Sequence, residues 1–444
     1  MHRNLPLLSY LQFAIRCIGF FIKRRFPMSL EQFGTPISRR NFVRLVGAGV
    51  TAAATLPTFA QQATVASDTM PRQRGMGQMR ELPPGTIIIS SNENPLGPAD
   101  VARAAMTEAA PLGGRYDKTG VARATVKTIS EQFGLKPGYV ELYPGSSGPL
   151  DMALMSNISP DRGLVCGDPS YEQGPRAADA AKAPLKLVPL TSTYAHDVKA
   201  MVAADPKAGE FYIVNPNNPT GTMTPREDIL WLLKNKPAGS VVIVDEAYFH
   251  FSNDESVIDQ VAADQDIIVL RTFSKIYGMA GIRAGFAFAR PDLLEKFQSI
   301  SPEIRLRNVA SVSLISAAGA GASLRDPNLV PTRRKINTDN RAATLEFLEK
   351  NGYKYIPGSQ ANFFMVDVKR PGRQFEESML NEKIAIGRTW KALPTYVRVT
   401  VGTADEMAKF QAAFVKCMDM PVAGPSVAYM HPSGFYLPSE LDRA

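Results

Sequence analysis

Four short runs of β-branched and aliphatic residues constrain the fold of this chain more than any other feature. They cover residues 85–89, 211–214, 241–244 and 267–270, and alternate with helical stretches such as 101–109 and 229–234. Continuous apolar runs of this length are typical of strands buried on both faces, and intervening helices favour a parallel arrangement. The sequence therefore predicts an α/β fold in which helices cover a mostly parallel sheet.

Length and charge limit the classes of function. With 444 residues, the chain is long enough for two globular domains. The net charge is +8, but residues 1–60 hold eight Lys and Arg residues against the single acid Glu31. The remainder is nearly neutral, which excludes nucleic acid and anionic lipid as main partners. Cys17, Cys166 and Cys417 lack the spacing of a disulfide framework or a metal site, so no metal is expected.

The first 60 residues are interpreted as an export leader. The motif Ser38-Arg39-Arg40-Asn41-Phe42-Val43-Arg44 precedes an apolar run at 45–56 and the small residues near Ala60. This order is typical of a twin-arginine signal, so we expect an exported or periplasmic protein that is cleaved after Ala60. The apolar stretch 11–22 is short and carries Arg16, which disfavours a membrane span. Translation from Met28 and an uncleaved anchor both remain open.

Two further segments flank the predicted globular body. Residues 61–83 are polar and without periodicity, which predicts a flexible stalk. Residues 421–444 contain several Pro and Gly residues and are expected to form an extended tail.

The segment 271–283 contains the residue most suggestive of catalysis. Lys275 comes just after an apolar run, and Arg283 lies eight positions further on. In a parallel sheet the binding crevice lies beyond the carboxyl ends of the strands. A lysine that is partly desolvated there and close to other cations has a lowered pKa, and its neutral amine can form an imine with an aldehyde. The hydroxyls of Thr272 and Ser274, with the Arg283 guanidinium, suit a phosphate ester. These residues together predict pyridoxal 5'-phosphate (PLP).

Polar residues after the other runs fit the same cofactor. Asp245 can pair with a protonated pyridine nitrogen, while Tyr248 and Asn218 can reach the phenolic oxygen of the ring. Tyr171 can stack on the ring face, and the loop 145–148 before a predicted helix can bind phosphate. Each motif alone is commonly a turn or a packing feature, but all of them fit one ligand.

At these motifs the sequence resembles the fold-type I PLP aminotransferases (class I/II), specifically the histidinol-phosphate aminotransferase branch. The resemblance runs from residues 91–98 to residues 397–403. It implies the aspartate aminotransferase-like fold: a large PLP-binding domain over 84–310 and a smaller α+β domain over 311–420. The arm 84–110 is expected to contribute to the smaller domain.

The resemblance also implies individual roles. Lys275 would hold PLP and move the proton, with Asp245 and Tyr248 as the other catalytic residues. Arg398 would clamp the substrate carboxylate, and Tyr116 would reach the cofactor phosphate of the neighbouring subunit in a homodimer. The remaining cofactor ligands implied are Ser146, Ser147, Tyr171, Asn218, Ser274 and Arg283, and the remaining substrate residues are Arg388 and Asn94.

The chain departs from the branch at several positions. Ser147-Gly148 replaces an acidic pair, and His250 stands where glutamate is common, although a histidine among aromatic residues is more often a packing residue. Arg305 and Arg307 replace an aromatic position. Together with Arg388, their charge indicates either an anionic substrate side chain or a solvated face.

The resemblance predicts an aminotransferase that acts on an amino acid or amine and a 2-oxo acid. Export argues against histidinol phosphate as the substrate, because histidine synthesis is cytoplasmic. Other PLP chemistry (racemase, lyase or decarboxylase) and a non-catalytic PLP-binding protein remain as alternatives. No stable membrane partner is expected beyond the export machinery.

Overall fold

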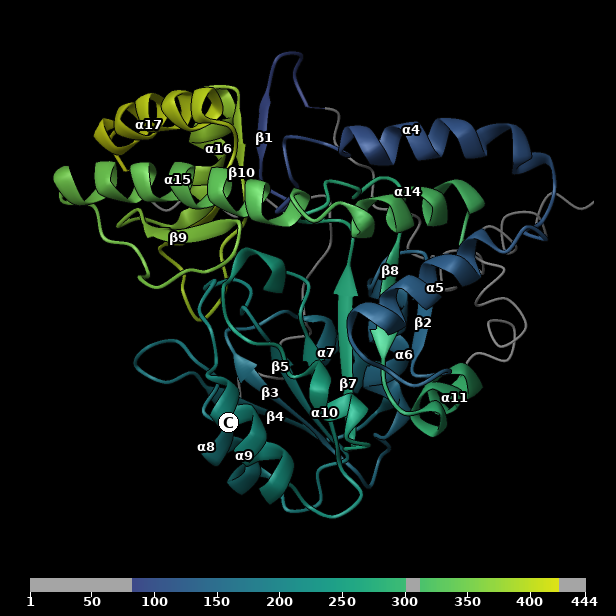
Figure 1. Cartoon of the computed structure of the whole chain (residues 1–444). Coiled ribbons are helices and arrows are strands. Elements are labelled where there is room, and N and C mark those ends of the chain that lie inside the picture. The colour runs from purple at the N-terminus through teal and green to yellow at the C-terminus, as the bar shows by residue number, and fades with distance from the viewer. Residues whose placement is uncertain (1–81, 301–311, 423–444) are drawn as a thin grey trace, which may run out of the picture. The chain divides into compact units, whose positions relative to one another are not determined.

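The computed structural model describes residues 82–300 and 312–422, which lie within one compact unit, Glu81–His431 (Figure 1). The predicted leader and cleavage site, most of the predicted stalk, Arg305, Arg307 and nearly all of the predicted tail lie outside these residues. Among the described residues, no helix combines the length and hydropathy needed to cross a membrane.

A seven-stranded sheet forms the centre of this unit, in the strand order β2-β8-β7-β6-β5-β3-β4. Strands β3 to β7 are mutually parallel, and β8 runs antiparallel to both of its neighbours. The mostly parallel sheet expected from the apolar runs is therefore confirmed. The strands are β2 (Val140–Tyr143), β3 (Leu164–Asp168), β4 (Leu185–Pro189), β5 (Glu210–Val214), β6 (Val241–Asp245), β7 (Ile267–Thr272) and β8 (Gly285–Phe288).

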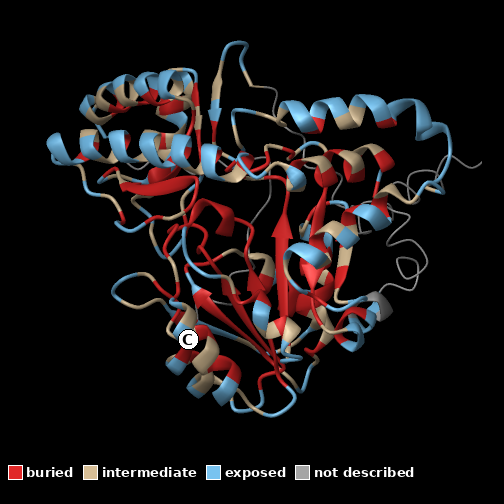
Figure 2. Cartoon of the chain, in the orientation of Figure 1, coloured by how far each residue is buried: buried red, intermediate tan, exposed pale blue. Residues whose placement is uncertain are grey.

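Helices cover both faces of the sheet. Successive side chains of a strand point to opposite faces, so each strand contributes to a core on either side. In β5, Phe211 and Ile213 pack into one core, while Tyr212 and Val214 pack into the other. Figure 2 shows the strands as a buried interior between helices whose outer faces are exposed. The first core includes α4 (Asp100–Ala109), α5 (Val121–Gln132), α8 (Val198–Ala204), α9 (Arg226–Asn235), α10 (Ile258–Ala262) and α14 (Leu314–Arg325). The second includes α6 (Ser147–Ser156), α7 (Gln173–Ala181) and α11 (Pro291–Ile300).

A separate apolar core is built from the C-terminal part of the chain and the N-terminal arm. It contains β9 (Phe363–Asp367), β10 (Ile384–Ile386), β11 (Tyr396–Thr400), α15 (Leu329–Lys350), α16 (Gly372–Asn381) and α17 (Ala404–Asp419). Strand β1 (Ile87–Ile89) pairs in parallel with β10. The run 85–89 therefore does not join the central sheet as the other three runs do, because Ile89 packs into this separate core.

Helices α4 and α14 pack side by side over the large sheet (Figure 1). Gly319 of α14 allows this approach, since a Cβ atom at that position would lie 2.8 Å from the Met106 side chain. Part of the range expected for the small domain, residues 314–325, thus contributes to the core of the large sheet. The arm 84–110 likewise divides, with β1 in one core and α4 in the other.

Candidate active site

A cavity of about 430 Å³ lies at the carboxyl ends of the central strands. Its volume falls within the range of roughly 300–1,000 Å³ that is typical of small-molecule sites. Most of the predicted site residues meet in its lining: Ser146, Ser147, Tyr171, Asn218, Asp245, Tyr248, Ser274, Lys275, Arg283, Arg388 and Arg398.

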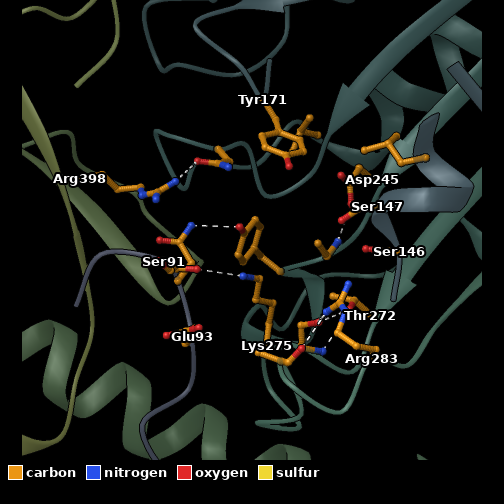
Figure 3. A pocket seen from close by; sticks show the side chains of 18 of the residues that line it. Ser91, Glu93, Ser146, Ser147, Tyr171, Asp245, Thr272, Lys275, Arg283 and Arg398 are labelled. Carbon is orange, nitrogen blue, oxygen red and sulfur yellow. Dashed lines mark hydrogen bonds between the residues drawn. The ribbon is translucent and has the colours of Figure 1, made fainter. Parts of the chain in front are cut away.

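Lys275 projects into this cavity from the loop that follows β7 (Figure 3). Its ammonium donates a hydrogen bond to the Ser91 carbonyl at 3.2 Å and lies 5.5 Å from the centre of the Tyr248 ring. Burial, reinforced by the positive charge of Arg398, lowers the pKa of Lys275 to about 8. Only the neutral amine adds to an aldehyde. Lys275 therefore becomes reactive as the pH rises past its lowered pKa of about 8, and not past the ordinary lysine pKa of 10.5.

Asp245 ends β6 and lies on the opposite wall of the cavity from Lys275 (Figure 3). The Tyr212 hydroxyl donates to one carboxylate oxygen at 3.2 Å, and the Ala247 amide donates to the other at 3.1 Å. Burial raises the pKa of Asp245 to about 6. A buried carboxylate of this kind gains from a cationic partner, and a protonated pyridine nitrogen would supply one.

The phosphate end of the site is formed where α6 begins. Ser146 caps this helix and Ser147 is its first residue, so backbone N–H groups and hydroxyls face the cavity. Across from them, Thr272 donates to Ser274 at 2.9 Å, and Arg283 donates to Ser274 at 3.3 Å. This clustering of hydroxyl donors around a guanidinium fits a phosphate dianion. The altered Ser147-Gly148 pair does not remove the helix N-terminus from the site.

Two glycines allow this close assembly. A Cβ atom on Gly145 would overlap the Arg283 guanidinium, and one on Gly285 would lie 2.6 Å from the Gly145 backbone. Gly145 also has a φ of +87°, which favours glycine. The backbone thus leaves Arg283 just enough room to lie beside the start of α6.

Arg398 lies at the other end of the cavity, on β11 (Figure 3). One terminal nitrogen donates to the Asn218 side chain at 2.7 Å, and the other donates to the Ser90 carbonyl at 2.8 Å. Its Nε atom is buried without a hydrogen-bond partner among the described residues. Arg398 lines the cavity, and each of its terminal nitrogens keeps a second N–H group that can bind a ligand acceptor.

The N-terminal arm supplies site residues whose roles were not predicted. Asn92 donates to the Tyr248 hydroxyl at 3.0 Å, and Asn362 donates to the Asn92 and Glu93 carbonyls at 3.1 and 3.2 Å. Ser91, Asn92 and Glu93 all line the cavity. These polar residues directly follow an apolar strand, β1, as the predicted site residues follow the other apolar runs. Their position in the sequence could therefore have identified them.

Asn94 does not line this cavity, in contrast to its predicted contact with substrate. Its amide donates to the Ile276 carbonyl at 3.0 Å, and Arg333 donates to the same oxygen at 3.0 Å. Asn94 therefore supports the loop that carries Lys275, and Asn92 is the arm asparagine that faces the cavity. The chain turns between them, since Asn92 has a φ of +54°.

His250 and Tyr116 also lie outside this cavity. His250 is buried, with Nε2 at 3.4 Å from Arg271 and its ring edge-on to Tyr277. Burial lowers its pKa well below the ordinary value, with Arg271 and Arg334 adding to the effect, which agrees with its interpretation as a packing residue. Tyr116 is 85% exposed.

The cavity thus fits PLP at three points: hydroxyls and a guanidinium for the phosphate, a buried carboxylate for the pyridine nitrogen, and an amine for the aldehyde. This combination defines a lysine-dependent PLP enzyme. The comparisons with known proteins narrow the class.

Residues 84–414 match the family "Aminotransferase class I and II". The chain is 34% identical over 332 residues to histidinol-phosphate aminotransferase 1 of Nitrosococcus oceani, covering 73% of this chain and 87% of that protein. A solved structure from Erwinia carotovora atroseptica, provisionally assigned as a histidinol-phosphate aminotransferase, is 30% identical with a TM-score of 0.69, covering 74% of this chain and 95% of that one. The Sinorhizobium meliloti histidinol-phosphate aminotransferase in complex with PLP is 22% identical with a TM-score of 0.67, covering 75% and 90%.

The chain belongs to the class I and II aminotransferase family. It is a PLP-dependent aminotransferase, and the expected aspartate aminotransferase-like fold is confirmed.

The packing around Gly145 leads to a test of the phosphate site. Replacing Gly145 with alanine forces Arg283 away from the start of α6 and strains a backbone with positive φ. We expect G145A to weaken PLP binding by at least about tenfold in an equilibrium titration of the apoprotein. Gly134 also has a positive φ, +63°, lies outside the cavity lining and has nothing within 4 Å of an added Cβ atom, so G134A serves as the matched control. Equal affinities of the two folded variants would contradict this account.

Proposed function

We propose that this aminotransferase transfers an amino group between an amino acid or related amine and a 2-oxo acid, with Lys275 as the residue that binds PLP covalently. The observation that carries the proposal is the position of Lys275 in a cavity that lowers its pKa to about 8, opposite Asp245. When bound, PLP supplies an electron sink for the pair released at the substrate Cα.

The surrounding side chains have distinct roles in this proposal. Asp245 keeps the pyridine nitrogen protonated, and Tyr248 and Asn218 hold the phenolic oxygen. Lys275 would take the proton from the substrate Cα and deliver it to C4' of the cofactor. Tyr171, which is on the cavity wall near Asp245, covers the ring face.

Among the other reactions that PLP supports, Arg398 argues against decarboxylation. The remaining N–H groups of its two terminal nitrogens suit a planar carboxylate, and a substrate held by its carboxylate is poorly placed to lose it. Relatives named histidinol-phosphate aminotransferases suggest one donor. The proposed export argues for another amino acid or amine.

The proposal predicts a defined spectroscopic behaviour. PLP-loaded protein is expected to show a visible absorption band that one or more amino donors abolish and a 2-oxo acid restores. K275A is expected to lose this response and the covalent link to PLP that borohydride reduction fixes. Its turnover is expected to fall by several orders of magnitude. A loaded protein whose band no donor changes would support the alternatives, namely other PLP chemistry or PLP binding without catalysis. Covalent attachment that survives in K275A would refute the assignment of this lysine.

We further propose a homodimer in which Tyr116 reaches the cofactor phosphate of the neighbouring subunit. The 85% exposure of Tyr116, close in sequence to the exposed apolar residues Val101 and Leu112, supports a covered surface here. Light scattering is expected to give twice the chain mass, and Y116F is expected to bind PLP several-fold more weakly. A monomer with full activity would exclude this arrangement.

The twin-arginine motif supports a proposal of export to the periplasm. Changing Arg39 and Arg40 together to lysine is expected to retain the protein inside the cell, because the export route requires both arginines. The matched control changes Arg72 and Arg74 to lysine, which preserves the same charge outside the motif. Cell fractionation separates the outcomes, and periplasmic protein from the Arg39/Arg40 variant would disprove the proposed route.

A further inference from the structure

A charged pair lies at the rim of the active-site cavity, next to the residues that bind cofactor and substrate. Arg388 follows β10 and lines the cavity, and Glu172 directly follows Tyr171 at the start of α7. The two side chains form a hydrogen-bonded ion pair between the large-sheet unit and the C-terminal core. Arg388 is 48% exposed and Glu172 is 29% exposed. A ligand can therefore reach the pair.

Aromatic and acidic residues surround the Arg388 guanidinium. Its guanidinium lies 4.6 Å from the centre of the Trp390 ring, and that of Arg398 lies 5.2 Å from the same ring. The carboxyl of Glu376 is buried beneath this region, and burial raises its pKa to about 7 although Arg388 acts in the opposite direction. Arg388 is thus held beside the carboxylate clamp, with the Glu172 carboxylate as its ion-pair partner.

We propose that Glu172 determines the charge preference of this enzyme: by pairing with Arg388 it selects against donors with an anionic side chain and favours neutral or cationic ones. This inference rests on the proposed aminotransferase function. The sequence alone indicated either an anionic side chain or a solvated face for the extra arginine. The structure offers a third arrangement, because Glu172 occupies the guanidinium.

The selection follows from the geometry of the pair. An anionic side chain that uses Arg388 has to displace Glu172, and the displaced carboxylate stays at the rim close to the incoming anion. Glu93 adds a further carboxylate to the lining of the same cavity. A neutral amide side chain leaves the pair in place and meets no like charge. The α-carboxylate is unaffected, since Arg398 binds it separately.

The test compares two ligands of similar shape and different charge. Glutarate carries two carboxylates, and its monoamide, glutaramate, carries one. With PLP-loaded protein and calorimetric titration, E172Q is expected to bind glutarate at least about fivefold more tightly than the unaltered enzyme does. Its affinity for glutaramate is expected to change by less than about twofold on the same basis. Glu227 is exposed on α9, so E227Q removes the same charge elsewhere and is expected to change neither affinity.

A double variant assigns the effect to the pair. In the R388Q background, E172Q is expected to lose its effect on glutarate, because no guanidinium is left to release. Equal gains for both ligands, an unchanged affinity for glutarate, or absence of glutarate binding in both proteins would each overturn the inference. Melting temperatures verify that the variants are folded.

A failure of the proposed function would look different. In that case no amino donor changes the visible band of the unaltered protein, whereas binding of the two ligands stays measurable. If donors do react, the ratio of kcat/KM for glutamate to that for glutamine is expected to rise at least about fivefold in E172Q, mainly through KM. An unchanged ratio would overturn the charge selection while leaving the aminotransferase activity intact.

Discussion

The short arm segment Ser90–Glu93 is the structural constraint on which the active site depends, because it lies where the two parts of the fold meet. Its backbone carbonyls accept hydrogen bonds from Arg398, Lys275 and Asn362. Each donor comes from a different part of the chain. These hydrogen bonds tie the carboxylate clamp and the lysine to neighbouring residues of one short segment. Strand β1 keeps the arm in place by pairing with β10.

A second constraint lies behind the cavity, where Glu246 and Arg271 form a buried ion pair at 2.7 Å. Glu246 directly follows Asp245, and Arg271 lies four residues before Lys275, so the pair aligns the ends of β6 and β7. The Arg271 guanidinium also lies about 5 Å from the rings of Phe133 and Phe249. Loss of one partner of such a pair typically costs about 3–5 kcal/mol. Burial lowers the pKa of His250 well below its ordinary value, and the neighbouring Arg271 adds to this effect.

Much of this site follows from the sequence because side-chain chemistry and strand position carry the signal. Asp245 and Lys275 stand out as polar residues after apolar runs, and the structure brings both to one cavity. The sequence does not show that the run 85–89 leaves the central sheet, since its partner β10 is three residues long and almost 300 positions away. Backbone acceptors such as the Ser91 carbonyl have no sequence signature. The choice between Asn92 and Asn94 also needs the folded chain, because two asparagines two positions apart look alike in the sequence and only Asn92 lines the cavity. The pairing of Glu172 with Arg388 spans 216 positions and needs the folded chain.

The distribution of charge in the cavity explains how one site can bind the phosphate dianion of the cofactor and the carboxylate of the substrate at separate positions. Arg283 and the start of α6 attract the phosphate at one end, and Arg398 attracts the carboxylate at the other (Figure 3). Lys275 lies between them, and burial, together with the positive charge on both sides, lowers its pKa. If Arg388 were unpaired, it would be a third guanidinium in this cavity and could bind an anion away from the phosphate and carboxylate positions. Because Glu172 engages Arg388, the cavity keeps one guanidinium for the cofactor and one for the substrate carboxylate, and the substrate side chain meets a rim without excess positive charge.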